Sequence, residues 1–402
     1  MTPEDWLEGL AGAEVPGHVS RLMRLCLMDW AACAKAGQGE PVAAVIGPAG
    51  EDAARRALVW GTQGHALDFD DTHFGHIGHT SAVVMPALLA LAGDRPMVEV
   101  LEAAAVGSEA ALRVGLWLGR AHYQVGFHQT ATSGAVGAAV GAARLLSLEA
   151  ARLRHALGLA ATAASGLKGQ FGTMGKPLNA GLAARVAVES VLWARAGMTS
   201  DPAGLSGPQG FGATHHGEGR AEAFEGPDWQ ITGVSHKFHA CCHGLHAMLE
   251  ALREAPRDVV RVTVHTHPRW LSVCNQLAPD TGLGVKFSYR HTAAMALRGR
   301  DTGDSAVFTD ETARDPVLME WRERVDVLGD DSVAETATRV VLTRENGSEV
   351  TLTHDLARPM PLDAREARLT AKVATLLREA ETLVALTRSD SAKALADWLQ
   401  RP

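Results

Sequence analysis

The sequence predicts a mainly helical protein in which a large all-helical domain is interrupted by a smaller α+β domain. Residues 18–235 carry apolar side chains at helical spacing, the period changes to two near Val259, and the helical pattern returns at Asp363. We therefore expect an all-helical first part over residues 1–240 and an α+β domain over 241–364. Residues 365–402 should form C-terminal helices that return to the helical domain.

The helical part is rich in alanine and glycine. Residues 18–36 place Val19, Leu22, Cys26 and Trp30 at helical spacing, and similar patterns run through residues 98–119, 131–146, 148–164 and 178–197. Small side chains let helices approach one another closely. The pattern indicates a compact domain of many helices.

The α+β part is predicted from three alternating segments, at residues 259–266, 336–343 and 348–353. The last two are separated by Asn346-Gly347, a pair that favours a tight hairpin turn. Residues 286–300 and 311–325 are expected to be helical between the strands. This mixture is typical of a small α+β unit.

Composition excludes several classes of function. The chain has 402 residues and a net charge of −8, with acidic and basic residues mixed throughout, so a nucleic-acid surface is not expected. The N-terminus lacks the basic and apolar runs of a secretory signal. The longest apolar stretch, residues 81–92, is too short for a bilayer. We expect a cytoplasmic protein with no membrane partner.

The five cysteines do not form a ligand pattern. Their spacing is irregular and includes no Cys-x-x-Cys, which argues against a zinc–thiolate site or an iron–sulfur cluster. A disulfide framework is also not expected in a cytosolic chain of this size. The cysteines are interpreted as small buried apolar residues.

The densest polar cluster runs from Gly64 to His79. If residues 53–72 form a helix, His65, Asp68 and Thr72 share one of its faces. One interpretation is a proton-transfer cluster near a reacting centre, and the other is an ordinary solvated helix end. The mixture of Asp and His also suits a metal, but no His-Glu-x-x-His or comparable spacing occurs, so no metal site is predicted.

Three further residues lie just before predicted helices: His128, Lys176 next to Pro177, and Lys237. Helix N-termini attract anions through free N–H groups and the helix dipole. If the three ends converge, they could hold several carboxylates, with both lysines exposed in a pocket. The alternative is that each is a solvated side chain at an ordinary helix end.

Several segments, in the same order along the chain, resemble the signature motifs of the MmgE/PrpD family, which includes 2-methylcitrate dehydratases, cis-aconitate decarboxylases and iminodisuccinate epimerases. The resemblance covers nearly the whole chain. The matching segments are residues 65–73 (His-Ala-Leu-Asp-Phe-Asp-Asp-Thr-His), 79–86, 126–128 with 132–135, 171–178 (Phe-Gly-Thr-Met-Gly-Lys-Pro-Leu), 237–246 and 286–288.

The resemblance implies a homodimer whose active site lies between the helical domain and a smaller α+β lid, with no metal or organic cofactor. By resemblance to the decarboxylase branch of the family, the active-site positions correspond here to Asp68, Thr72, His79, His128, Lys176 and Lys237. The expected roles are catalytic for Asp68, His79 and His128, through proton transfer. Thr72, Lys176 and Lys237 are expected to bind substrate, the lysines through its carboxylates. Which of the three catalytic residues is the base stays open.

The sequence departs from the family pattern at several positions. Thr80 stands where proline is usual after His79, and Asn179 stands where histidine is usual after Lys-Pro-Leu; around Lys237 the departures are Phe238, Ala240 and His243. The cationic residues are retained, so a small di- or tricarboxylate substrate is expected, but the lining of the pocket differs.

The expected activity is that of a hydro-lyase on a compound of the 2-methylcitrate or aconitate type, which removes a proton next to a carboxylate. An epimerase or racemase of the iminodisuccinate type and a decarboxylase of a cis-aconitate-like compound are the enzymatic alternatives. A non-catalytic metabolite-binding protein is the alternative from another class.

Overall fold

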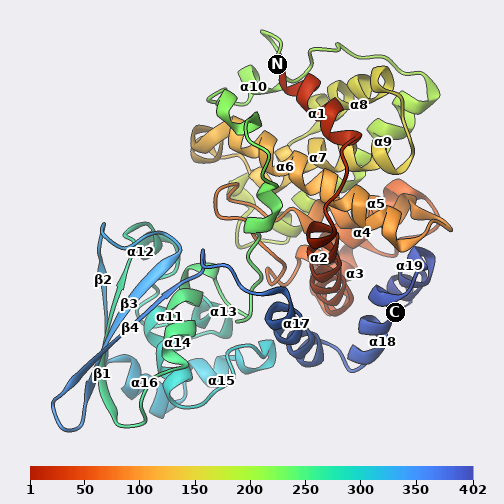
Figure 1. Cartoon of the computed structure of the whole chain (residues 1–402). Helices are drawn as coiled ribbons and strands as arrows, with labels where there is room; N and C mark the ends of the chain where they lie inside the picture. The colour runs from red at the N-terminus through yellow and green to blue at the C-terminus, as the bar shows by residue number, and fades with distance from the viewer. Residues whose placement is uncertain (402) are drawn as a thin grey trace. The chain divides into compact units, whose positions relative to one another are not determined.

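The structure is a computed structural model and describes residues 1–401. The chain divides into two compact units (Figure 1). The helical unit comprises residues 1–236 and the C-terminal segment that begins at Arg365. The α+β unit comprises Lys237–Ala364. The prediction of a mainly helical chain with a small sheet in its C-terminal part is confirmed.

The helical unit contains most of the α-helices of the chain. They are α1 (Pro3–Ala11), α2 (Gly17–Ala36), α3 (Pro41–Ile46), α4 (Ala53–His65), α5 (Ser81–Ala92), α6 (Met97–Val125), α7 (Gln129–Leu145), α8 (Ala150–Ala163), α9 (Gly175–Ala196), α10 (Phe211–Thr214), α17 (Leu362–Leu376, which begins in the α+β unit), α18 (Ala380–Arg388) and α19 (Ala392–Gln400). Short 3-10 helices are η1 (Gly37–Gly39), η2 (Lys168–Gln170), η3 (Ala221–Phe224) and η4 (Gln230–Gly233).

Helix α7 is the centre of the helical unit and packs against α5, α6, α8 and α9. Nearly all of its residues are buried. Helices α4 and α9 approach so closely that a Cβ atom on Gly181 would lie 2.2 Å from the carbonyl oxygen of Leu58. Small residues are therefore required at this crossing, as the composition predicts, and the contact sets the spacing between the two helices that carry His65 and Lys176.

The α+β unit is built on a four-stranded sheet with the order β2-β1-β3-β4 (Figure 1). Strands β1, β3 and β4 form antiparallel neighbours, whereas β2 pairs with β1 in parallel. The elements of this unit are β1 (Val259–Thr266), β2 (Val325–Gly329), β3 (Ala337–Arg344), β4 (Glu349–Asp355), η5 (His243–Leu245), η6 (Ser305–Val307), α11 (His246–Leu252), α12 (Arg269–Val273), α13 (Gly282–Val285), α14 (Tyr289–Leu297), α15 (Asp310–Ala313) and α16 (Pro316–Arg322).

Three of the four strands coincide with the alternating segments in the sequence. The hairpin between β3 and β4 turns at Asn346-Gly347, where Gly347 has a φ of +78° that only glycine adopts without strain. Strand β2 was not predicted, because its short segment Val-Asp-Val-Leu-Gly follows directly on a helical pattern. Helices α11 and α14 pack on the sheet.

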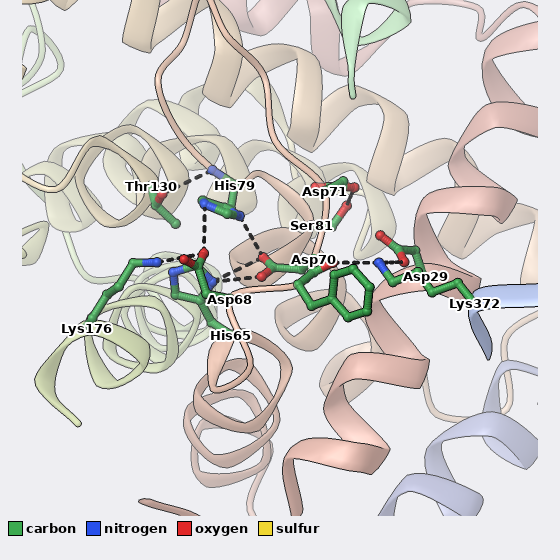
Figure 2. A network of polar contacts seen from close by, with 11 residues as sticks. Asp29, His65, Asp68, Asp70, Asp71, His79, Ser81, Thr130, Lys176 and Lys372 are labelled. Atoms are coloured by element: carbon green, nitrogen blue, oxygen red, sulfur yellow. Dashed lines mark hydrogen bonds and ion pairs between the residues drawn. The ribbon is translucent and has the colours of Figure 1, made fainter. Parts of the chain in front are cut away.

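The C-terminal helices belong to the helical unit. Lys372 of α17 places its Nζ atom 2.5 Å from Oδ1 of Asp29 in α2 and 2.5 Å from the carbonyl oxygen of Phe69 (Figure 2). The side chains of Asp29 and Lys372 are almost completely buried. An ion pair in this setting needs both members, because a lone buried charge is costly. It ties the end of the chain to the segment that follows α4.

Two compositional expectations concern the whole chain. All five cysteines have free thiols, and four of them are buried while Cys242 is half-buried, in agreement with a packing role. Among the helices of residues 1–401, none has both the length and the apolar character needed to cross a bilayer.

Candidate functional site

The polar cluster begins where α4 ends. The helix stops at His65 and not near residue 72, so the expected single helical face with Asp68 and Thr72 does not exist. Asp68 has a φ of +50°, in the left-handed region that interrupts a helix. Asp tolerates this conformation better than most residues, and such outliers occur often at functional sites. The turn brings both Asp68 and Asp70 back toward the end of α4.

The loop from Asp70 to Thr80 is held by backbone contacts. The N–H of Thr72 donates to the carbonyl of Ser235, and the N–H of Ser235 donates back, at 2.8 and 2.7 Å. His73 donates its N–H to the carbonyl of Gly78, which closes the loop. Helix α5 then starts at Ser81, with Thr80 as its N-cap residue but without a side-chain cap bond.

A chain of charged groups crosses the cluster (Figure 2). Nζ of Lys176 lies 2.8 Å from Oδ1 of Asp68, and the same oxygen lies 3.6 Å from Nε2 of His79. On the other side of the ring, Nδ1 of His79 lies 3.1 Å from Oδ2 of Asp70. Asp70 also contacts Nδ1 of His65 at 3.0 Å. The order is therefore Lys176, Asp68, His79, Asp70, His65.

Exposure differs along this chain. The Asp68 side chain is 38% exposed and that of Lys176 is 15% exposed, whereas Asp70 and His65 are fully enclosed. A ligand can therefore reach Asp68, Lys176 and one edge of His79, but not Asp70. Burial by itself raises the pKa of Asp70, but the charges and hydrogen bonds of His65 and His79 outweigh it and hold that pKa well below 3.8. Asp70 is thus a buried carboxylate.

Two other histidines of the loop, His73 and His76, are buried and make contacts that hold the loop in place. Burial lowers the pKa of His73 to about 4 and that of His76 to about 3, so both rings are neutral at pH 7. His73 contacts the carbonyl of Gln230, and Nε2 of His76 lies 2.6 Å from Oγ of Ser133. These contacts hold the loop against η4 and α7.

His128 lies beside the charged chain. It is the N-cap residue of α7, as the sequence predicts, and its ring stacks on His65 at 5.8 Å and meets Phe171 edge-on at 4.9 Å. Burial lowers the pKa of His128 well below 6.5, and the neighbouring His65 and Lys176 charges lower it further. The ring is therefore neutral at pH 7.

Lys176 lies inside a helix. Helix α9 starts at Gly175, two residues earlier than Pro177 suggests, so Lys176 is its second residue and not the residue before it. Its ammonium group lies at the helix N-terminus, which is the anion-attracting end, and 5.5 Å from the ring of Phe171. The predicted cation at a helix start is present, and Asp68 is its partner.

Thr72 and Lys237 are the two remaining predicted site residues. Thr72 is half-buried and contributes its backbone to the pairing with Ser235. Lys237 belongs to the α+β unit and is only 2% exposed, so it is not the exposed lysine that the sequence suggested. Within its own unit it lies near His246, whose pKa burial lowers well below 6.5.

Two groups of side chains have the composition of metal ligands. His65, Asp68, Asp70 and His79 have ligand atoms within 4.8 Å of one another, as do the buried Cys26, Asp71 and His236. In the first group the ammonium of Lys176 already neutralises Asp68. Beside the second, the guanidinium of Arg365 lies 3.4 Å from Nδ1 of His236. A protein cation therefore accompanies each group.

Sequence reasoning selected Asp68, His79, His128 and Lys176, which lie together. It missed Asp70 and His65 as partners of His79, and Asn179 as a neighbour of His128. The signal for Asp70 was its place two residues after Asp68 in the same acidic run, and both carboxylates contact His79. Asn179 was noted only as a departure from a pattern.

Two domains of one known protein family match this chain. The MmgE/PrpD N-terminal domain matches residues 4–223, and the MmgE/PrpD C-terminal domain matches residues 235–385. The chain belongs to the MmgE/PrpD family. The resemblance read from the motifs is thereby confirmed.

Several curated relatives in the MmgE/PrpD family are similar to parts of this chain. The cis-aconitate decarboxylase-like protein oryM of Aspergillus oryzae is 29% identical over 63% of this chain and 61% of its own length. The cis-aconitate decarboxylase of Aspergillus terreus is 27% identical over 63% of this chain and 59% of its own length. The human cis-aconitate decarboxylase is 32% identical over 39% of this chain and 34% of its own length. The match spans about three-fifths of the Aspergillus proteins.

Proposed function

We propose that this chain is a lyase that acts on a small di- or tricarboxylate of the citrate or aconitate type and needs no bound cofactor. The observation that carries the proposal is the chain from Lys176 through Asp68 and His79 to Asp70. It combines an accessible cation, Lys176, with a histidine, His79, whose Nδ1 atom contacts the buried carboxylate of Asp70. A mere binding protein needs the cation, but it does not need the second feature.

The chemistry requires that charge be stabilised where it develops. When a proton or CO2 leaves a carbon next to a carboxylate, negative charge spreads onto that carboxylate. Fixed cations stabilise such charge best when little water surrounds them. The Lys176 ammonium, at the start of α9, supplies this role in the proposal. Substrate would compete with Asp68 for the ammonium, which frees the Asp68 carboxylate.

His79 is proposed as the group that moves the proton. A carboxylate at Nδ1 favours the tautomer that leaves Nε2 unprotonated, and it stabilises the imidazolium that forms when Nε2 takes a proton. Asp70 lies at that nitrogen, at 3.1 Å. Nε2 lies on the side of Asp68, where the side chains are exposed. Asp68 is the second proton-transfer candidate because a substrate can reach it.

Thr72 and Lys237 complete the proposal as substrate-binding residues, on the strength of the family motif. Lys237 is a buried cation, and a charge-assisted contact between an ammonium group and a carboxylate is strong where little water is present. A carboxylate of the substrate is the partner proposed for it. The proposed enzyme is a homodimer, a point that light scattering of the purified protein tests.

Dehydration is the first candidate reaction, because it uses both a cation for the carboxylate and a base for the adjacent C–H. Decarboxylation is the second, and the names of the similar Aspergillus and human proteins favour it. In dehydration the electrons of the broken C–H bond pass toward the adjacent carboxylate and then form the alkene as the C–O bond breaks, and the proton taken up by His79 or Asp68 is returned to the hydroxyl, which leaves as water. In decarboxylation the electrons of the broken C–C bond pass toward the retained carboxylate as CO2 departs, and a protonated His79 or Asp68 delivers a proton to the carbon. The same Lys176 cation serves either one.

A two-stage experiment tests the proposal. A thermal-shift screen of di- and tricarboxylates identifies ligands, because a ligand raises apparent stability by mass action. Compounds that bind are then incubated with the enzyme in deuterated buffer, and products are identified by NMR. A new alkene with release of water indicates dehydration, and released CO2 indicates decarboxylation. Deuterium incorporation without net change indicates epimerisation, which contradicts the lyase. Binding without any conversion indicates a metabolite-binding protein and contradicts catalysis.

A further inference from the structure

Asn179 of α9 lies beside the ring of His128. Its Nδ2 atom is 3.3 Å from Nδ1 of His128 and 3.2 Å from the carbonyl oxygen of Leu167. Asn179 is 8% exposed and His128 is 3% exposed, so both groups are largely removed from water. The same amide nitrogen therefore contacts two possible acceptors, and an amide NH2 group has two hydrogens to donate.

The carbonyl of Leu167 determines which way this amide faces. If the amide were turned over, its oxygen would lie about 3.2 Å from the Leu167 oxygen, and two acceptors would oppose each other. The Leu167 carbonyl is itself fixed, because Phe127 and Leu167 form a bridge. In that bridge the N–H of His128 donates to Gly166 at 2.8 Å, and the N–H of Lys168 donates to Gly126 at 2.8 Å.

The geometry decides the tautomer of the ring. With its NH2 group toward both partners, Asn179 donates to Nδ1 of His128, so Nδ1 must be the unprotonated nitrogen. The proton of a neutral ring is then on Nε2. We propose that Asn179 is a positioning residue that holds His128 as the Nε2–H tautomer, which makes this ring a neutral hydrogen-bond donor to substrate and not the catalytic base.

The surroundings of the ring agree with a neutral donor. Three groups that carry or can take up a positive charge lie near His128: His65 of α4, Lys176 of α9 and His79 of the loop. The carboxylate of Asp68 is also near and has the opposite effect on the pKa of His128. The N-terminus of α7, which His128 caps, adds further positive potential. These groups and burial disfavour the imidazolium. A neutral imidazole beside a helix N-terminus can polarise a substrate oxygen without giving up its proton.

The role of the donor rests on the proposed function, whereas the tautomer rests on the contacts alone. In the lyase reaction, Nε2–H would donate to the carboxylate oxygen on which charge develops. The proton stays on the ring, so no proton has to be returned at the end of the cycle. Proton transfer is then left to His79 and Asp68.

The experiment uses the full-length protein with 15N-labelled histidine. The His128 resonances are identified by their absence in His128→Gln, and long-range 1H–15N correlation spectra distinguish a protonated from an unprotonated ring nitrogen. We expect Nε2 to be protonated and Nδ1 unprotonated throughout pH 6–8. An Nδ1–H tautomer, or a doubly protonated ring at pH 7, overturns the proposal.

Two variants test whether Asn179 is the cause. Asn179→Asp offers only acceptors to Nδ1, so the His128 signals should change to the Nδ1–H or doubly protonated form. Turnover should fall roughly a hundredfold, the loss typical of removing one donor to a developing oxyanion. Asn179→Ala, which removes both contacts, should give a mixture of tautomers and covers the case in which Asn179→Asp does not fold. Unchanged His128 signals in Asn179→Ala contradict the proposal.

The control Asn346→Asp makes the same chemical change in the β3–β4 turn and should leave the His128 signals and turnover unchanged. The two proposals fail in different ways. If the Nε2–H tautomer is observed but His128→Gln keeps wild-type turnover on every converted polycarboxylate, the assigned role in the lyase reaction is wrong and the tautomer assignment stands. If the tautomer is absent while His128→Gln is inactive, the present inference is wrong and the proposed function stands.

Discussion

The carboxylate of Asp70 lies 3.1 Å from Nδ1 of His79, on the buried side of the ring, while Asp68 lies on the accessible side (Figure 2). The same carboxylate contacts His65. Asp70 therefore orients the ring that is proposed to move the proton, although it is too deeply buried to touch substrate itself. This relationship makes Asp70 the most informative residue to change.

Asp70→Asn should lower kcat by roughly a hundredfold or more and leave KM within a few-fold. The amide keeps the shape of the side chain but removes the negative charge that stabilises an imidazolium, and losses of this size follow when an orienting Asp is neutralised. The midpoint of the acidic limb of the rate profile should move to lower pH, because His79 loses its partner charge. Steady-state kinetics over pH 5–9 measure both effects.

The thermal stability of Asp70→Asn at different pH values provides a second test of the role of Asp70. The pKa of Asp70 is held well below 3.8, so its pairing stabilises the fold above the pKa of the unfolded chain and is lost as the pH falls through the folded value. Asp70→Asn should therefore melt earlier than wild type at pH 7, with a smaller difference at low pH. A variant that retains wild-type kcat and the wild-type acidic limb would remove Asp70 from the mechanism.

The sequence predicts the elements better than the contacts between them. The alternating strands β1, β3 and β4 and the helical segments were recognisable because their periods differ and their lengths are ordinary. The end of α4 was not, since Ala66 and Leu67 continue the helical pattern and only the left-handed conformation of Asp68 interrupts it. That one turn places the carboxylates of both Asp68 and Asp70 at the ring of His79.

The candidate site was predictable only as a set of residue types. The cluster around Asp68 and His79 was visible as a run of polar residues, but the pairing of Asp70 with His79 depends on the loop that returns from Asp71 to Thr80. Similarly, the contact of Asn179 with His128 joins residues 51 positions apart. Lys237 was expected in an exposed pocket, and its burial depends on packing that has no local signal.

Lys176→Met should raise KM or lower kcat/KM by roughly tenfold to a hundredfold. The substitution keeps the aliphatic chain and removes a charge-assisted contact, which contributes about 1.5–3 kcal/mol. The fold should tolerate the change, because the side chain is partly exposed and its partner Asp68 is 38% exposed and can be solvated. Lys393→Met, which removes an exposed lysine of α19, is the matched control and should behave as wild type.

Lys237→Met tests the second proposed carboxylate contact. Lys237 is buried, and methionine keeps the aliphatic part of its side chain while removing the charge, so the variant should still fold. It should also lose most of the thermal shift that a polycarboxylate produces. If both lysine variants bind substrate and turn it over as wild type does, the proposed binding of carboxylates by these cations is wrong.

Chelation should leave activity unchanged. The ligand atoms of His65, Asp68, Asp70 and His79 come within 4.8 Å of one another, but Lys176 already supplies a positive charge at Asp68. We expect protein dialysed against a strong chelator to keep its turnover, with metal content followed by elemental analysis. Loss of turnover that one specific divalent ion restores would show that this group holds a required metal.

Asp71→Asn should change the pH dependence of stability without a role in substrate binding. Asp71 is buried next to Asp70, and Oγ of Ser81 donates a hydrogen bond to it (Figure 2). Burial raises the pKa of Asp71 from 3.8 to about 7, and the charges of Asp29 and Asp70 add to this, although the Ser81 bond opposes it. Between these two values the folded protein binds a proton that the unfolded chain has released.

The wild-type fold should therefore lose stability as the pH rises from about 4 to 7, by on the order of 1.4 kcal/mol per pH unit from this group, with no further loss well above 7. Asp71→Asn cannot ionise, so its free energy of unfolding relative to wild type should rise over that range and then level off. The new amide hydrogens can cost about 1–3 kcal/mol if unpaired, but that cost does not vary with pH. Urea unfolding at several pH values measures the difference, and Asp397→Asn, at an exposed carboxylate of α19, is the control. A difference between Asp71→Asn and wild type that stays constant from pH 4.5 to 8 would mean that Asp71 is ionised in the folded protein throughout.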